Sequence, residues 1–306
     1  MENRILSLAD VYKVFGKVRA VDGISFELER GEIFGLLGPN GAGKTTTIRM
    51  IMDIIEPDQG TVEFSSSGQK SKKAEIGYLP EERGLYDDAR TGDVLEYLGV
   101  LKGLQRQDAR KKAKAWLKRL DLVAEEDSKI KELSKGMAQK VQFVASVLHE
   151  PKLAILDEPF AGLDPVNQDL FKGIVRDLKK SGMTVLLSSH RMNMVEELCD
   201  RIFMIHRGKR VLYGNLAEIK EGFGRDLVEM DFVGNAETLE GFSDEVVVDL
   251  EIEGNSAKFY LEEGYSPDRF LRTLPEELEV TEISVKRPPL HDIFVAKAKG
   301  GSDEQG

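Results

Sequence analysis

A glycine-rich loop between an apolar run and a helical pattern is the feature that most constrains the fold of this chain. Residues 38–45 read Gly-Pro-Asn-Gly-Ala-Gly-Lys-Thr, which matches the pattern G-x-x-x-x-G-K-[ST]. The loop follows the run 33–37 and precedes a helical pattern from about Lys44. Glycines let backbone N–H groups turn inward around a phosphate, and a helix N-terminus adds partial positive charge. The sequence therefore predicts a nucleotide-phosphate site on an α/β sheet.

The side chains of this loop have separate expected roles. Lys44 would reach the β- and γ-phosphate oxygens, the hydroxyl of Thr45 would ligate Mg²⁺, and Thr46 would add a further phosphate contact. A plain tight turn is the alternative, and the position between strand and helix argues against it. The expected ATP-binding residues of this segment are Gly38, Pro39, Asn40, Gly41, Ala42, Gly43, Lys44, Thr45 and Thr46.

A second apolar run, 153–156, ends in two carboxylates, Asp157 and Glu158. The carboxyl ends of parallel strands meet at one edge of a sheet, which places Asp157 near the metal and Glu158 within reach of an attacking water. We assign Asp157 to Mg²⁺ and Glu158 to the role of general base. Taken alone, the pair is equally typical of a strand-end turn; together with the phosphate loop, it indicates catalysis.

The order of patterns predicts the architecture of a first domain, residues 1–220. Residues 4–30 alternate with the period of strands, and apolar runs at 184–187 and 202–205 are separated by helical patterns, as in a parallel α/β sheet. A mainly helical insertion occupies about 88–150. One helix in it has a basic face, which we interpret as a solvated surface balanced by nearby acidic residues. This face consists of Arg110, Lys111, Lys114 and Lys118.

Residues after Gly214 have a different pattern, which predicts a small α+β domain at 226–297. Helical patterns follow the first and third of four strand-like runs, and Gly254-Asn255 fits a two-residue hairpin loop between the middle pair. The order strand, helix, strand, strand, helix, strand is that of a ferredoxin-like domain. The runs lie near 227–233, 245–253, 256–262 and 278–287. The tail, 298–306, is expected to be disordered.

Composition and charge exclude some classes of function. A net charge of −11 argues against a chain whose main task is to bind a phosphate backbone. No apolar tract is long enough to cross a bilayer. The first residues lack the order of a signal peptide, and the single cysteine, Cys199, has no partner within the chain. We therefore expect a cytoplasmic location and no nucleic-acid partner.

The segment 133–137, Leu-Ser-Lys-Gly-Met, shortly before the acidic strand, resembles the signature of ATP-binding cassette (ABC) ATPases, usually written LSGGQ. The resemblance implies that Ser134 and the Gly136 N–H, at the start of a helix, meet the γ-phosphate held by the opposite subunit of a dimer. Lys135 and Met137 depart from the common form, while Ser134 and the second glycine are kept. We call residues 133–137 the signature segment.

Further positions match the same family in order. Residues 161–165 resemble its D-loop, which includes Asp164, and His190 resembles its switch histidine, unlike the other histidines, His149, His206 and His291. Phe15 has the spacing before Lys44 of the aromatic that stacks on adenine, with Tyr12 as the competing candidate.

Glu81 stands where the family usually carries glutamine after a strand. A carboxylate there would still accept a hydrogen bond from water or ligate Mg²⁺, and it adds negative charge beside the phosphates. The alternative is an exposed loop glutamate without a role in the site.

The signature segment and the runs 79–86 and 287–294 resemble ATPase subunits of ABC-2-type exporters. The resemblance implies a P-loop NTPase fold, with a RecA-like parallel core, an antiparallel β subdomain and a helical signature subdomain, beside the ferredoxin-like domain. It implies that the chain forms a homodimer or pairs with a closely related ATPase subunit. It also implies that ATP and Mg²⁺ are the cofactors. A separate integral-membrane ABC-2-type permease would dock on the helical insertion, near the loop after Glu81, at the cytoplasmic face of the cell membrane.

Other functions remain as alternatives. A soluble ABC ATPase that acts on nucleic acid or the ribosome is disfavoured by the acidic charge and the single cassette. A GTPase switch would carry an N-K-x-D tetrapeptide, and the sequence contains none. For residues 226–297, the role stays open between ligand sensing, support of a dimer, contact with the permease, and simple packing.

Overall fold

The computed structural model describes residues 3–65, 72–82, 84–223, 226–236, 238–239, 246–262, 264–274 and 278–300, with the side chains of 72–73 and 298–300 left out. Contacts divide the chain into two units, 1–213 and 214–306. The boundary lies before residue 220, the predicted end of the first domain, because α8 (Leu216–Gly222) belongs to the second unit.

The core of the first unit is a six-stranded sheet whose strands follow the order β5-β6-β7-β3-β8-β9. Its strands are β3 (Ile33–Leu37), β5 (Ile76–Leu79), β6 (Leu153–Asp157), β7 (Thr184–Ser189), β8 (Arg201–His206) and β9 (Lys209–Asn215). The pairs from β5 to β8 are parallel, and every residue of β3, β6 and β7 is buried. Full burial explains why these strands are continuous apolar runs rather than alternating ones. The expected parallel core is confirmed.

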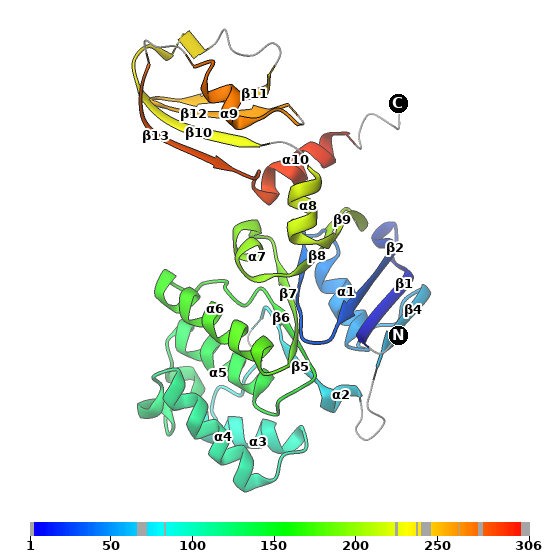
Figure 1. Ribbon diagram of the computed structural model, residues 1–306. Helices are drawn as coiled ribbons and strands as arrows, with labels where there is room; N and C mark the ends of the chain where they lie inside the picture. The colour runs from blue at the N-terminus through cyan, green and yellow to red at the C-terminus, as the bar shows by residue number, and fades with distance from the viewer. Residues whose placement is uncertain are drawn as a thin grey trace. The chain divides into compact units, whose positions relative to one another are not determined.

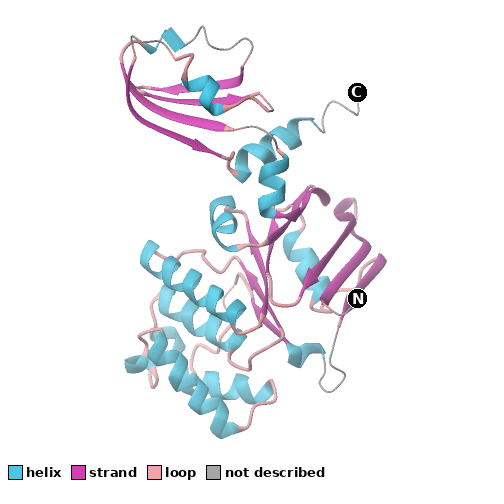
Figure 2. Cartoon of the chain, viewed as in Figure 1, coloured by secondary structure: helices cyan, strands magenta, loops and turns pink. Residues whose placement is uncertain are grey.

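A three-stranded antiparallel sheet, with strand order β2-β1-β4, forms a second layer. It contains β1 (Arg4–Phe15), β2 (Val18–Glu29) and β4 (Gln59–Phe64). Helix α1 (Lys44–Ile51) shares one buried hydrophobic cluster with β1, β2, β3 and β6, so it packs between the two sheets (Figure 1). The helices α6 (Pro165–Lys180) and α7 (Met192–Leu198) follow β6 and β7 in turn. Figure 2 shows helices of the first unit on both sides of the central strands.

The insertion between β5 and β6 is helical, as the sequence predicts. It contains α3 (Thr91–Leu101), α4 (Arg106–Arg119), the short 3-10 turns Val123–Glu125 and Ile130–Glu132, and α5 (Lys135–Val147), and β5 itself follows the short α2 (Lys72–Glu75). Ala113 and Leu117 of α4 are buried, and Trp116 meets Phe143 of α5 edge-on at 6.1 Å. On the opposite face, Lys114 forms an ion pair with Glu126 at 3.3 Å, in keeping with a solvated surface.

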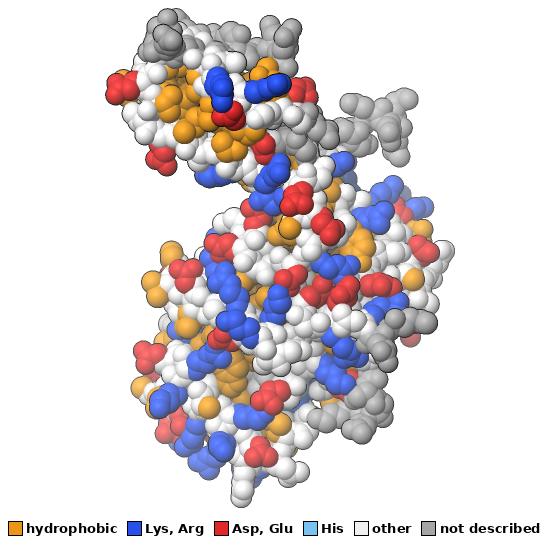
Figure 3. All heavy atoms as spheres, viewed as in Figure 1, with side chains coloured by type: hydrophobic (Ala, Val, Ile, Leu, Met, Phe, Trp, Pro, Cys, Tyr) orange, Lys and Arg blue, Asp and Glu red, His pale blue; other side chains and the backbone are white. Residues whose placement is uncertain are grey.

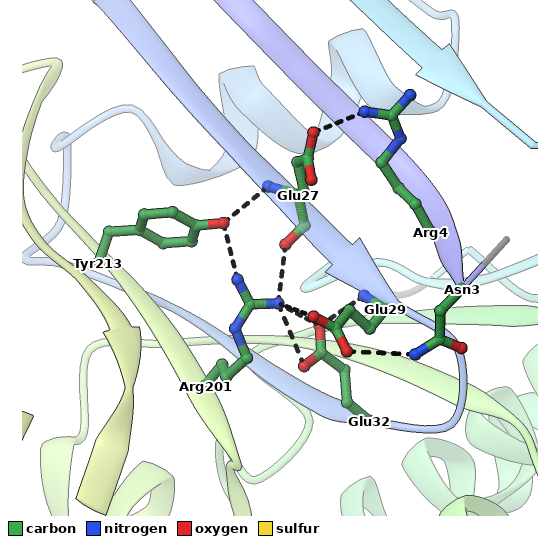
Figure 4. Close-up of polar contacts among 7 residues, drawn as sticks. All are labelled: Asn3, Arg4, Glu27, Glu29, Glu32, Arg201 and Tyr213. Atoms are coloured by element: carbon green, nitrogen blue, oxygen red, sulfur yellow. Dashed lines mark hydrogen bonds and ion pairs between the residues drawn. The ribbon is translucent and has the colours of Figure 1, made fainter. Parts of the chain in front are cut away.

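A polar cluster at the amino end of β8 joins the two sheets (Figure 4). Arg201 donates to Tyr213 Oη at 2.8 Å and to the Glu27 carbonyl at 3.3 Å, and its guanidinium lies 3.3 Å from Glu32 Oε1. Burial raises the pKa of Glu32, opposed by a backbone hydrogen bond from Glu29 and by the charge of Arg201. The cluster fixes β2 against β8 and β9. It lies at the amino end of β8, opposite to the carboxyl edge of the sheet.

The second unit is a four-stranded antiparallel sheet with order β11-β12-β10-β13, the order of a ferredoxin-like fold. Its elements are β10 (Leu227–Val233), β11 (Val247–Glu253), β12 (Ser256–Leu261), β13 (Glu279–Lys286), α8, α9 (Pro267–Leu271) and α10 (Leu290–Gly300). Val228, Met230 and Phe232 alternate into a core with Phe259 and Phe270.

The hairpin between β11 and β12 has the expected two-residue loop, with Glu253 opposite Ser256 and a positive φ of 62° at Gly254. The helical pattern expected between the first two strand-like runs falls in part on residues 237 and 240–245, which lie outside the described residues. The tail expected to be disordered begins within α10, and 301–306 also lie outside the described residues.

Candidate functional site

The loop 38–45 joins β3 to α1 at the carboxyl edge of the central sheet. Two of its glycines are required by close backbone approach. A Cβ on Gly38 would lie 2.2 Å from the Ile205 carbonyl oxygen, and one on Gly43 would lie 2.4 Å from the Ala20 carbonyl oxygen, where φ is also +114°. No side chain fits at either place, so the sequence pattern follows from the tight path of the chain around the loop.

Lys44 is buried at the mouth of this loop. Its Nζ donates to the Gly38 carbonyl at 2.7 Å and to the Pro39 carbonyl at 3.3 Å, and it lies 3.7 Å from Glu158 Oε1. An ammonium group has three N–H donors, and here they face two loop carbonyls and a carboxylate. The phosphate oxygens of a bound nucleotide would compete for these donors. The geometry suits a lysine that moves from carbonyls to phosphates when a nucleotide binds.

A cavity of about 450 Å³ opens over the loop. Thr45, Thr46, Asp157 and Glu158 line it together with Glu81. The cavity therefore joins residues from three separate places in the sequence. The full lining is Val18, Arg19, Ala20, Pro39, Asn40, Gly41, Gly43, Lys44, Thr45, Thr46, Glu81, Asp157, Glu158 and Arg207. The size lies in the range of small-molecule sites.

Asp157 ends β6 at the floor of the cavity and is only 2% exposed. Burial raises the pKa of Asp157, a hydrogen bond from the Ser188 hydroxyl opposes this, and the charges of Glu81 and Glu158 raise the pKa further. Its Oδ2 has no hydrogen-bond partner among the residues that the structure describes. A buried carboxylate oxygen without a partner is costly unless a cation meets it.

The donor set around this oxygen fits Mg²⁺. Thr45, Asp157 and Glu81 offer a hydroxyl and carboxylate oxygens, the hard ligands that Mg²⁺ prefers. Within the described ranges, no group of three or more His, Cys, Asp or Glu side chains could hold a metal by itself. A metal held by this donor set would take its remaining ligands from nucleotide phosphates and water.

Glu158, directly after β6, is held in an unusual backbone conformation. Its φ is +48°, a region that non-glycine residues rarely adopt, and its N–H donates to the Ser188 carbonyl at 3.2 Å. The carboxylate lies 2.8 Å from His190 Nδ1 and is 7% exposed. Strain of this kind persists where surrounding contacts fix it, commonly at functional sites. The structure thus brings together three residues that the sequence predicted: Lys44, Glu158 and His190.

Phe15 ends β1 beside the cavity, opposite Val18, which lines the cavity wall. Its ring is 51% exposed, whereas Tyr12 lies so close over Gly23 that a Cβ there would come 2.7 Å from Tyr12 Oη. A stacking platform needs an exposed ring, and Tyr12 is less exposed than Phe15. The geometry favours Phe15 as the aromatic next to a base, although its ring is not among the residues that line the cavity.

The signature segment lies elsewhere. Ser134 caps α5, accepting a hydrogen bond from the Met137 N–H at 3.3 Å, and Ser134 and Lys135 are exposed. Neither Ser134, Gly136 nor Met137 belongs to the lining of the phosphate-loop cavity. In the D-loop, Asp164 caps α6 by accepting from the Asn167 N–H at 2.9 Å, and this hydrogen bond holds the pKa of the Asp164 carboxyl below its usual value.

Some residues of the site were missed by the sequence analysis. Ser188 pairs with Asp157 across parallel strands, a register that no local pattern reveals. Arg207, in the turn between β8 and β9, and Arg19 bring positive charge to the cavity wall. Ser188 could have been found from the sequence, because it is one of two serines directly before His190. Arg207 gave no such signal, since it is a single arginine beside a glycine.

Two protein-family models match this chain. The model described as ABC transporter matches residues 21–161, and that described as ATP-binding protein DrrA1-3-like, C-terminal domain, matches residues 214–298. The first model covers the phosphate loop and the acidic strand, and the second covers the ferredoxin-like unit.

Individual proteins are similar over most of the chain. The uncharacterized ABC transporter ATP-binding protein YhaQ of Bacillus subtilis (strain 168) is 40% identical over 294 residues, which cover 96% of this chain and 98% of the relative. The Nod factor export ATP-binding protein I of Ralstonia nicotianae is 36% identical over 231 residues, covering 74% and 72%. A solved structure of the ATP-binding subunit of an ABC transporter superposes with a TM-score of 0.67 at 30% identity, covering 72% of this chain and 93% of its own.

Proposed function

The chain belongs to the ATP-binding proteins of ABC transporters, and on this premise we propose that two copies hydrolyse ATP at sites shared between them to drive export by a separate membrane permease. ATP hydrolysis is the activity of this family. The shared site, the direction of transport and the permease are the parts that we propose.

One observation supports a site shared between two copies. The predicted catalytic residues converge at one edge of the central sheet, namely Lys44, Asp157, Glu158 and His190. The N-terminus of α5, at Ser134, is exposed and lies outside the phosphate-loop cavity. A helix N-terminus with exposed N–H groups is a suitable partner for an anion. A second copy that presents its α5 to this cavity would place a capped helix start against the γ-phosphate of the first.

The residues of the cavity divide the work of hydrolysis. Mg²⁺ held by Thr45, Asp157 and Glu81 would neutralise charge on the phosphates. Lys44 positions the β- and γ-phosphate oxygens, and Glu158 accepts the proton of the attacking water. His190, 2.8 Å from Glu158 Oε1, keeps this carboxylate in place. Phe15 stacks on adenine, and Ser134, Lys135, Gly136 and Met137 belong to the helix start that the second copy supplies.

The partner that spans the membrane would dock on the helical subdomain. No helix within the described ranges is long and apolar enough to cross a membrane. A largely apolar cavity of about 420 Å³ lies between the loop after β5 and the helices α3 and α5. Its lining includes Pro80, Leu85, Leu98 and Leu101. A short helix of an ABC-2-type permease would fit there, and it would hold the chain at the cytoplasmic face of the membrane.

The proposed direction is export. The relative from Ralstonia nicotianae carries export in its name, and residues 214–298 match the family model described as ATP-binding protein DrrA1-3-like, C-terminal domain. The alternative, a soluble ATPase that acts on nucleic acid or the ribosome, has less support. On the face shown in Figure 3, acidic side chains are interspersed with lysines and arginines over the first unit, and the net charge is −11.

Glu158→Gln tests the shared site. The substitution removes the proton acceptor and one negative charge beside the phosphates, so turnover should fall by at least about a hundredfold while ATP binding persists. The variant should elute as a dimer with ATP and Mg²⁺, and as a monomer without them, in size-exclusion chromatography with light scattering. Lys44→Ala is the control, because it should neither bind ATP nor dimerise. Unchanged hydrolysis, or a Glu158→Gln chain that stays monomeric with ATP bound, would contradict the proposal.

A further inference from the structure

Lys135 stands where the usual signature has a glycine, and its side chain turns toward its own chain. A Cβ atom on Gly162 would lie 3.2 Å from Lys135 Cε and 3.3 Å from Lys135 Nζ. The stem and the ammonium group of the lysine therefore cover the backbone of the D-loop. Gly162 itself has a φ of +73° and no side chain to pack. The lysine thus supplies the packing that this part of the D-loop lacks.

Lys135 belongs to a polar stripe on α5. Lys135, Gln139 and Gln142 are spaced four and three residues apart, which places them on one face of the helix. Gln139 Nε2 donates to the Pro159 carbonyl at 2.9 Å, directly after Glu158, and Gln142 Nε2 donates to the Glu82 carbonyl at 2.9 Å, directly after Glu81. The stripe therefore ties the signature helix to the two loops that carry the carboxylates of the same chain.

The stripe lines a second cavity, of about 240 Å³, next to the phosphate-loop cavity. Its lining is Leu79, Pro80, Glu81, Lys135, Gln139, Gln142, Asp157, Glu158, Ala161 and Gly162. Three carboxylates, Glu81, Asp157 and Glu158, line both cavities. Lys44, Arg19 and Arg207 bring positive charge to the phosphate-loop cavity, and Lys135 brings it to the second cavity.

Two departures from the usual family sequence thus meet in one cavity. Glutamate at 81 in place of glutamine adds a negative charge, and lysine at 135 in place of glycine adds a positive one. Glu81 and Lys135 are both exposed, and near a protein surface opposite charges still attract more strongly than in bulk water. Glu81 lines this cavity together with Asp157 and Glu158, so its charge lies beside two other carboxylates.

We propose that Lys135 is a positioning residue that acts within its own chain. Its ammonium offsets the charge of Glu81, and its stem holds the D-loop, so that Lys135 and Glu81 function as a pair. The inference rests on the proposed ATP hydrolysis, and it assigns the contact with the partner's phosphate to Ser134 and Gly136 rather than to the lysine.

A double-mutant cycle tests the pair in the full-length chain. The variants are Lys135→Met, which keeps the apolar stem, Glu81→Gln, and both together, with steady-state ATP hydrolysis measured at saturating Mg²⁺. Lys135→Met should lower kcat about tenfold in the wild-type background and less than about twofold in the Glu81→Gln background, with KM for ATP within about twofold throughout. Lys135→Arg should restore most of the rate, because it restores the charge.

Lys140→Met is the matched control, since Lys140 is the other lysine of α5 and lies outside this cavity. Its effect should be the same in the wild-type and Glu81→Gln backgrounds. If Lys135→Met lowers kcat by equal factors in both backgrounds, or acts through KM alone, the pair is refuted and the lysine acts on the nucleotide instead.

Thermal unfolding without nucleotide separates this inference from the proposed function. Lys135→Met should lower the unfolding midpoint about 2 °C more in the wild-type background than in the Glu81→Gln background, because only the glutamate leaves an uncompensated charge. Strictly additive midpoints would overturn the pairing even in an active enzyme. A wild-type chain that fails to hydrolyse ATP would refute the proposed function, while the unfolding cycle would still decide the pairing.

Discussion

Glu158 illustrates how single residues of the site are set by contacts from several strands. Its positive φ is maintained by the Ser188 carbonyl, and its carboxylate is shared between Lys44 and His190. These partners come from β7, from α1 and from the residue after β7. A strained residue persists only when its surroundings specify it more than once. The position of the proposed base is thus a property of the sheet edge rather than of the local sequence.

At the residue scale, the sequence predicted which residues meet but not how. The phosphate loop, Asp157, Glu158 and His190 carry patterns of their own, and the structure brings them together. The hydrogen bond from Ser188 to Asp157 and the arginine at position 207 depend on strand register and on a turn between strands. Such features arise from pairing across the sheet, which residue spacing along the chain does not encode.

Glu32 gives a pH-dependent prediction at this scale. Burial raises its pKa above the ordinary 4.5, so the folded chain binds the proton more tightly than the unfolded chain. Its contribution to stability is present below about pH 4.5 and is lost as pH rises through the raised value. Between pH 4 and pH 7, the free energy of unfolding of Glu32→Gln should therefore increase relative to that of the wild type.

Urea denaturation across this pH range measures the difference between the two proteins. The Glu29 N–H donates to Glu32 Oε1 at 2.7 Å, and the amide oxygen of a glutamine at this position can still accept that hydrogen bond, so the comparison isolates the charge. Glu29→Gln, at a more exposed carboxylate that also faces Arg201, is the control. A difference that shrinks as pH rises would show that Arg201 dominates over burial.

At the scale of elements, the strands of the core were the most predictable part. β3, β6 and β7 are continuous apolar runs because both of their faces are covered, and α5 begins at a serine cap. The end of the first unit was less predictable. The change of pattern after Gly214 suggested a first domain ending at 220, but Asn215 caps α8 and the division falls at 213–214. A cap looks the same in sequence whichever unit its helix joins.

The cap of α5 yields a prediction that separates structure from function. Ser134→Ala should lower the free energy of unfolding by about 1 kcal/mol, because the Met137 N–H loses its acceptor. Ser134→Asp keeps a cap acceptor and should retain stability. The aspartate would nevertheless set a negative charge against a phosphate of the partner subunit, and hydrolysis should fall at least about tenfold.

Denaturant unfolding of the nucleotide-free chain and steady-state hydrolysis would be measured on both variants. Ser266 is an exposed serine at the N-cap position of α9, and its side chain makes no cap hydrogen bond. Ser266→Ala is therefore a control that should leave both stability and hydrolysis unchanged. Full activity in a stable Ser134→Asp chain would contradict the placement of this helix start against a phosphate.

At the scale of the whole molecule, each unit has a hydrophobic core of its own. The first unit packs its sheets around α1, and the second packs β10 and β12 against α9, with Phe259 and Phe270 4.8 Å apart. Separate cores are the mark of regions able to fold independently. The site uses only one of them, since every described residue that lines the phosphate-loop cavity lies between Val18 and Arg207.

A chain that ends after Asn215, and so keeps all of β9, should therefore fold and bind ATP with a dissociation constant within about threefold of the full chain. Titration with a fluorescent ATP analogue measures the affinity, and a cooperative thermal transition reports folding. Lys44→Ala in the shortened chain is the control for specific binding. The second unit supplies none of the described residues that line the cavity. Any loss of hydrolysis in a shortened chain that binds ATP normally would therefore place the contribution of 214–306 in pairing of the two copies rather than in nucleotide recognition. A folded chain that binds ATP more than about tenfold weaker would instead mean that the second unit shapes the site itself.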